Sequence, residues 1–118
     1  WQAVLLESAE AVLSVTPDAT SLAGLDVGVV GPHASGDVDW EVRAFFPGNS
    51  GLTEDPVTGS LNAALAQWLI PSGRAHGTYV AAQGTAVGRA GRIHVTSDGD
   101  DIWIGGRCVT VITGEVHL

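Results

Sequence analysis

The chain has 118 residues, of which 45% are hydrophobic and only 15% are charged, and its formal net charge is −8. All its basic residues are Arg, and they form no cluster, which argues against nucleic acid or an anionic membrane surface as a partner. No apolar run approaches the ~20 residues that a membrane-spanning helix needs. A chain of this length can bury one core, and its low charged fraction predicts apolar surface that packs against another segment.

The first quarter of the chain predicts a strand followed by short helical segments. Residues 3–6 are a short apolar strand candidate, and Ser8 can cap a helix over residues 9–14, which Pro17 would end. Residues 18–25 predict another helical turn or two, closed by a turn at the glycine near their end.

Two further strands are expected before residue 47. Residues 27–30 form the first, and the glycine- and proline-rich residues 31–37 form a loop. Residues 39–46 alternate between apolar and charged side chains, which predicts a strand with one face buried. The expected inner side is Trp40, Val42, Ala44 and Phe46, and the expected outer side is Glu41 and Arg43.

The strongest helix signal follows a loop over residues 47–51. Leucines and a tryptophan recur at helical spacing between residues 58 and 70, and alanines fill the remaining faces. A helix that is apolar almost all round is usually a buried one, so we expect it at the centre of the domain. Pro71 and the glycine after it would end the helix.

The remainder of the chain predicts strands at residues 77–83, 91–96, 102–105 and 109–118, with a tight hairpin turn at residues 97–100. Cys108 is expected to be a small buried or strand residue rather than a nucleophile. The fold class is therefore α+β: one domain over residues 1–118, with a curved, mostly antiparallel sheet (a partial barrel) wrapped around one buried central helix.

The start of that helix carries the chemistry. Its first turn has N–H groups without intrahelical partners, and the helix dipole places partial positive charge there. Gly59 allows an anion to approach closely, Ser60 adds a hydroxyl, and Asp55 adds a carboxylate just upstream. Two interpretations remain open at this point: ordinary helix capping, or an anion cradle with a proton carrier beside it.

Several strings occur in the order expected for one family: R-A-F-F-P-G at 43–48, E-D-P-V-T-G-S at 54–60, Q-G at 83–84 and G-R-A-G-R-I-H-V at 88–95. Together they resemble the C-terminal half of the phenazine-biosynthesis PhzF-like isomerases, over essentially the whole chain. The resemblance implies a fold of two similar halves, each a sheet around a central helix, as in diaminopimelate epimerase, with the substrate held between the halves.

The resemblance also implies site roles. Asp55 matches the family's acidic catalytic residue, and Thr58, Gly59 and Ser60 match the positions that hold the polar end of a small carboxylate substrate. The family's general-base glutamate belongs to a first half that this chain does not contain, so we expect the chain to be inactive alone. The implied reaction is proton transfer without a metal or an organic cofactor, in the cytoplasm.

Competing functions stay open. Related epimerases place a cysteine near this helix start, whereas this chain has Asp55 there and its single cysteine far downstream, which argues against a cysteine-type epimerase. A non-catalytic small-molecule-binding or dimerisation module, and a structural domain in which Asp55 and Ser60 only cap the helix, are the alternatives. The expected partner is the missing first half or a second copy of the chain, as a homodimer. Because the chain starts at Trp1 without a Met, we expect a piece of a longer product.

Overall fold

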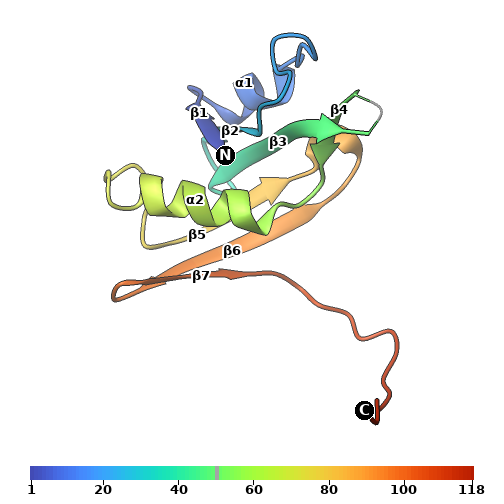
Figure 1. Ribbon diagram of the computed structural model, residues 1–118. Coiled ribbons are helices and arrows are strands. Elements are labelled where there is room, and N and C mark those ends of the chain that lie inside the picture. The colour runs from blue at the N-terminus through green and yellow to red at the C-terminus, as the bar shows by residue number, and fades with distance from the viewer. Residues whose placement is uncertain (50) are drawn as a thin grey trace.

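A computed structural model describes residues 1–49 and 51–118. In chain order its elements are β1 (Gln2–Leu5), α1 (Ala9–Ser14), β2 (Val27–Pro32), β3 (Trp40–Gly48), β4 (Gly51–Asp55), α2 (Gly59–Leu69), β5 (Thr78–Gln83), a 3₁₀ turn (Thr85–Val87), β6 (Gly91–Asp98) and β7 (Asp101–Gly105). The class is α+β with strands predominating, as expected (Figure 1).

The strands form one open, mixed sheet. Its order is β1-β2-β3-β5-β6-β7, and β4 pairs with the second half of β3. Two pairs are parallel, β1 with β2 and β3 with β5, and the other four pairs are antiparallel. The connection between β3 and β5 contains β4 and α2. Because β3 and β5 are parallel, this connection has to cross the sheet, and α2 lies in the crossing segment.

The two helices pack on opposite faces of the sheet. Side chains alternate along β3, so Trp40, Val42 and Ala44 join the core beneath α2. Phe45 joins a second core that includes Val12 of α1. Figure 1 shows α1 above the β1–β2–β3 side of the sheet and α2 across the strands on the other side.

The second core corrects the prediction for residues 39–46. Because α1 covers the face that was expected to meet solvent, Glu41 and Arg43 are buried, with relative exposures of 2% and 6%. The Arg43 guanidinium makes a bidentate contact with Glu54, at 3.0 Å from Nε and 2.8 Å from Nη2. Its Nη1 donates to the carbonyl oxygen of Val15 at 2.7 Å, just past the end of α1. A buried charge is therefore paired and also caps a helix.

Helix α2 begins and ends within one residue of the predicted bounds, with Thr58 as N-cap and Ile70 as C-cap. It buries one stripe, which consists of Leu61, Asn62, Leu65, Ala66 and Leu69. The opposite side is exposed in this chain, and Trp68 is 38% exposed. The described residues therefore bury only one side of α2, whereas the sequence predicted a helix buried on nearly all sides. Neither helix of the described ranges is long and apolar enough to cross a membrane.

Several smaller expectations need revision. Residues 18–25 form hydrogen-bonded turns rather than a helix, with the Asp18 carboxylate accepting from the Ser21 N–H. Strand β4 was not predicted, because its sequence of turn-forming and charged residues has no strand periodicity. The loop expected over residues 47–51 narrows to the β3–β4 connection, of which Ser50 lies outside the described residues.

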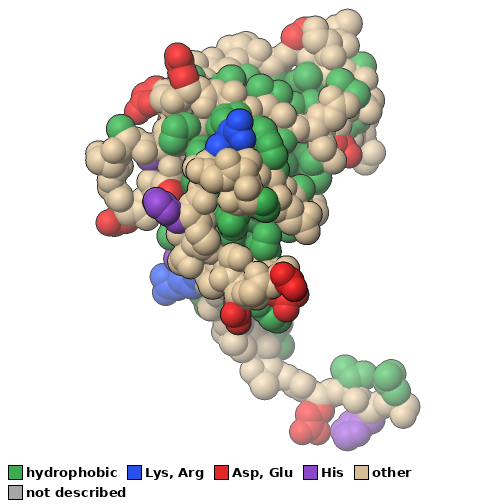
Figure 2. Space-filling model, turned by 90° about the vertical axis from the view of Figure 1, so that its left-hand side faces the viewer, with side chains coloured by type: hydrophobic (Ala, Val, Ile, Leu, Met, Phe, Trp, Pro, Cys, Tyr) green, Lys and Arg blue, Asp and Glu red, His purple; other side chains and the backbone are tan. Residues whose placement is uncertain are grey.

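The prediction of a final strand over residues 109–118 is wrong. No regular structure follows Gly105, and the last residues stand away from the body of the molecule (Figures 1 and 2). Val111 and Ile112 are 85% and 88% exposed. Cys108 is likewise exposed and outside any strand. The apolar alternation in this segment favours a strand, but a strand needs a neighbouring edge with which to pair, and none lies beside it here.

Candidate functional site

The strings at residues 83–84 and 88–95 both contact the loop at residues 56–58, which leads into α2. A Cβ added to Gly84 would lie 2.7 Å from the carbonyl oxygen of Pro56, and one added to Gly91 would lie 2.6 Å from that of Gln83 and 3.2 Å from that of Pro56. Only glycine permits this approach, so the loop rests directly on β5 and β6. Gly91, in the string at residues 88–95, is therefore a close-packing position.

Gln83, the last residue of β5, holds the same loop through hydrogen bonds to Asp55 and Thr58. It is fully buried and makes four hydrogen bonds. Its Nε2 donates to the carbonyl oxygen of Asp55 and to the hydroxyl of Thr58, each at 2.9 Å. Its Oε1 accepts from the Thr58 N–H at 3.0 Å and from Asn62 Nδ2 at 2.9 Å. The loop geometry is thus fixed by a single side chain whose hydrogen-bonding capacity is fully used.

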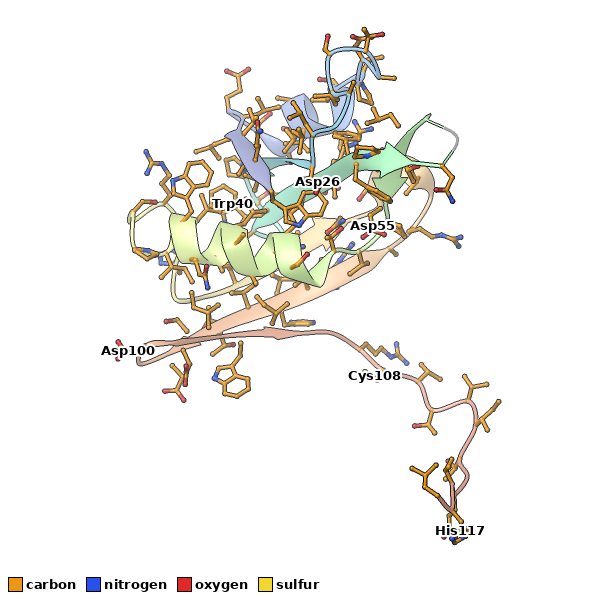
Figure 3. The ribbon with its side chains drawn as sticks, in the orientation of Figure 1. Asp26, Trp40, Asp55, Asp100, Cys108 and His117 are labelled. Carbon is orange, nitrogen blue, oxygen red and sulfur yellow. The ribbon has the colours of Figure 1, made fainter. Side chains whose placement is uncertain are left out.

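Asp55 ends β4 beside the first turn of α2 (Figure 3). Side chains of adjacent strand residues point to opposite faces, so Glu54 points to Arg43 and Asp55 points to the other side. The carboxylate of Asp55 is half-buried and accepts from the Thr58 hydroxyl at 2.6 Å through Oδ2. Of the two neighbouring acids, Glu54 is structural and Asp55 is the one at the site.

The tip of α2 is open. Thr58 makes no side-chain capping hydrogen bond, and the first turn contains no acidic residue. Within the described ranges, no group of the chain accepts from the N–H of Gly59 or Ser60. Both residues are exposed, and a Cβ added to Gly59 would meet nothing within 4 Å. Among the described residues, Asp55 and Ser60 therefore make no capping hydrogen bond to α2, and the N–H groups at the helix terminus are exposed.

The residues predicted at the site thus occupy different positions. Gly59 and Ser60 are on the surface, and the hydroxyl of Ser60 accepts from the indole N–H of Trp1 at 3.1 Å. Thr58 is buried, and its N–H, carbonyl and hydroxyl all bind groups of the chain. Thr58 therefore holds the Asp55 carboxylate through its hydroxyl and is not itself exposed at the surface. Sequence reasoning missed this support, because the partner that reveals it, Gln83, lies in another strand.

Basic groups line a cavity of about 480 Å³ next to the same loop. Its lining includes Val57, Arg92, His94 and Arg107. In a chain of net charge −8, Arg92 and Arg107 place two positive charges at this cavity. Residues 1–49 and 51–118 contain no group of three or more His, Cys, Asp or Glu side chains placed to hold a metal ion.

A second buried acid lies on the α1 face of the sheet. The Oε2 atom of Glu41 lies 3.0 Å from His33 Nε2, and its Oε1 has no hydrogen-bond partner among the described residues. Neither the burial of Glu41 nor this contact is evident from the sequence. Glu41 shares its side of β3 with Arg43, so it belongs to the packing of α1 rather than to the tip of α2.

The chain is an α+β protein with one open mixed sheet and a carboxylate, Asp55, beside an exposed helix terminus. The phenazine biosynthesis-like family model matches residues 1–114, so the chain belongs to this family. Two proteins of Pseudomonas aeruginosa, named uncharacterized isomerases PA2770 and PA3578, are 33% and 35% identical over 98% of the chain. These names support an isomerase family.

Solved structures agree with this assignment. A phenazine biosynthesis protein of the PhzF family from Enterococcus faecalis matches 98% of the chain with a TM-score of 0.66 and 30% identity. A PhzF-family protein from Bacillus anthracis has the same fold over 86% of the chain, with a TM-score of 0.61 and 19% identity. The chain spans only 43% of the length of each Pseudomonas relative and 44% of the Enterococcus chain.

Proposed function

We propose that the chain is the C-terminal part of a PhzF-like isomerase and contributes one side of a site for cofactor-independent proton transfer on a small carboxylate-bearing substrate. The observation that carries the proposal is the open α2 tip beside Asp55. The N–H groups of Gly59 and Ser60 bind the substrate carboxylate, and the Ser60 hydroxyl donates a further hydrogen bond. Asp55 receives or returns the proton at the reacting carbon.

Of the three predicted substrate-binding residues, only Gly59 and Ser60 contact the substrate in this proposal. Thr58 was expected among them, but its burial and its bonds to Asp55 and Gln83 leave it no free polar atom. Thr58 acts instead on the carboxylate of Asp55. The relatives' isomerase names support this class of chemistry, although they do not name a substrate.

A second polypeptide segment closes the site in this proposal. Support comes from the open tip, from the exposed side of α2 and from relatives more than twice as long as the chain. In the complete protein, the sheet wraps further round α2 as one half of a diaminopimelate epimerase-like fold, in the cytoplasm. A second copy of the chain is the alternative partner, and the measured mass of the chain in solution distinguishes the two.

Binding to the open tip can be tested without knowing the substrate. In the 118-residue chain, 2-aminobenzoate, a stable small carboxylate, should shift the amide NMR signals of Gly59 and Ser60. The substitution Gly59→Ala adds a methyl group where the chain leaves open space, so the fold should persist while binding weakens about tenfold or more.

The matched control is Gly77→Ala, which places a methyl group in ordinary contact 3.7 Å from Ser97, just before the end of β5 that lies opposite Gln83. It should leave binding unchanged. Equal binding by wild-type chain and Gly59→Ala would exclude the helix tip as the carboxylate site. Binding without isotope exchange in the complete protein would favour the non-catalytic module over the isomerase.

A further inference from the structure

The hydrogen bonds around Gln83 determine the direction of the proton on the Thr58 hydroxyl. The Thr58 N–H can only donate, so the atom of the Gln83 amide facing it, at 3.0 Å, is Oε1. The carbonyl oxygen of Asp55 can only accept, so the atom facing it at 2.9 Å is Nε2. These two backbone groups therefore determine which atom of the Gln83 amide is oxygen and which is nitrogen.

The fixed amide then orients the hydroxyl. Nε2 has only hydrogens to offer, so the Thr58 oxygen, 2.9 Å away, must accept from it. The single hydroxyl proton of Thr58 is left to donate to Asp55 Oδ2, at 2.6 Å. Among the described residues, no hydrogen bond reaches the other carboxylate oxygen, Oδ1.

We propose that Gln83 is a positioning residue that, through the Thr58 hydroxyl, commits Oδ2 of Asp55 and leaves Oδ1 as the oxygen that exchanges a proton with the substrate. The inference rests on the proposed function and adds to it a named proton-carrying atom and the residue that selects it. Gln83 touches no substrate. Its effect on the carboxylate oxygens of Asp55 passes through the Thr58 hydroxyl, and it also holds the backbone carbonyl of Asp55.

The substitution Gln83→Glu tests this without changing the shape of the side chain. The introduced carboxylate still accepts from Thr58 N–H and Asn62, but it offers no hydrogen to Thr58. The Thr58 hydroxyl therefore turns to donate to the new carboxylate, and Asp55 loses its donor. The matched control is Gln67→Glu, the same exchange at an exposed position of α2.

Activity is measured as deuterium uptake from solvent, in the longer protein to which the proposed function assigns this chain. The probe is a dihydro-hydroxyanthranilate, the compound isomerised in the best-known reaction of the PhzF-like family. Gln83→Glu should lower kcat about tenfold or more near neutral pH, with 2-aminobenzoate affinity within about threefold of wild type. The ratio of variant to wild-type rate should recover as the pH falls, because the protonated carboxyl again donates to Thr58. A rate ratio that is the same at every pH would overturn the inference.

A double-mutant cycle tests the route through Thr58. Thr58→Val removes the hydroxyl, so adding Gln83→Glu to it should lower kcat by much less than Gln83→Glu does in the wild-type background. Additive losses would contradict the inference. Thr58→Ser keeps a hydroxyl and should retain most of the activity, which guards against variants that merely fold poorly.

One arm does not depend on catalysis. In the 118-residue chain, the Thr58 hydroxyl proton should exchange slowly with solvent and show an NOE to the Asp55 β-protons. Gln83→Glu should abolish that NOE and Gln67→Glu should not. If Asp55→Asn leaves deuterium uptake unchanged, the proposed function fails. If the NOE survives in Gln83→Glu, the positioning role fails.

Discussion

Glu54 and Asp55 show how neighbouring acids acquire different roles. Both are carboxylates in the same five-residue strand, but the strand alternation sends Glu54 to the buried Arg43 and Asp55 to the tip of α2. Their surroundings then separate them further, because Glu54 receives two hydrogen bonds from a guanidinium and Asp55 receives one from a hydroxyl. Position along the strand decides which acid lies beside the tip of α2.

Arg43→Met should destabilise the chain strongly. The substitution leaves Glu54 nearly buried without its partner and removes the donor to the Val15 carbonyl. Removing one member of a buried ion pair typically costs about 3–5 kcal/mol, and the free energy of unfolding in urea should fall by that order.

The control for this prediction is Arg89→Met at an exposed position, which should change the free energy of unfolding by no more than about 0.5 kcal/mol. The double variant Arg43→Met, Glu54→Leu should recover part of the loss, since no unpaired charge remains. A single-variant loss no larger than that of the control would show that the pair is unimportant for stability.

Tyr79 gives the stability a dependence on alkaline pH. Burial raises its pKa from an ordinary value of 10.0 to about 12. A raised pKa in the folded state means that folding favours the neutral phenol, so this contribution is complete below pH 10 and is lost as the pH rises towards 12. Urea denaturation between pH 9 and about 11.5 should show falling stability in wild type and a weaker fall in Tyr79→Phe. Parallel curves for the two proteins would show that Tyr79 is not responsible.

Only part of the site could be predicted from its residues. Asp55, Gly59 and Ser60 were identified because they lie within one string at the start of a helix, where their chemistry is visible. The role of Gln83 was not predicted, because it depends on pairing between residues 25 positions apart. Thr58 was placed among the substrate contacts because a sequence does not show which side of a loop is covered.

At the level of elements, local signals were reliable where they were strong. The Ser8 cap, the spacing of leucines in α2 and the turn at Gly99 predicted α1, α2 and the β6–β7 hairpin to within a few residues. The final strand was mispredicted because alternation shows only what a segment can form, whereas pairing requires an edge. Strand β4 was missed for the opposite reason, since pairing with β3 outweighs its weak local preference.

Gly91→Ala should disturb the loop that carries Asp55. A methyl group there would lie 2.6 Å from the carbonyl oxygen of Gln83 and 2.5 Å from Val57, so backbone must move. We expect a loss of roughly 1–3 kcal/mol in the free energy of unfolding, together with shifted NMR signals for Asp55 and Gly59. Gly77→Ala is the control, and equal effects of the two substitutions would argue against close packing at Gly91.

At the level of the whole molecule, the order of the strands and the opposite placement of α1 and α2 were not predictable from the sequence. The prediction of one half-buried face for β3 failed because nothing local shows that α1 returns to cover residues 41 and 43. The predicted mostly antiparallel sheet is confirmed, with parallel pairs at β1–β2 and β3–β5 as an addition. Contacts between distant segments decide these features.

Under the proposed function, the chain should be inactive alone. Asp55 and the tip of α2 lie at the surface, where water competes for every polar group that a substrate would use. The two Pseudomonas relatives are more than twice as long as the chain, and in the proposed function the additional segment excludes this water. The proposed chemistry therefore depends on association between this chain and a second segment.

The most direct measurement is deuterium uptake from solvent into a dihydro-hydroxyanthranilate, followed by NMR, for the longer protein, its Asp55→Asn variant and the isolated 118-residue chain. Uptake should be observed only with the longer protein, and Asp55→Asn should lower its rate about a hundredfold or more. Uptake by the isolated chain that disappears with Asp55→Asn, or an unchanged rate for this variant of the longer protein, would contradict a proton-transfer site that is completed by a second segment.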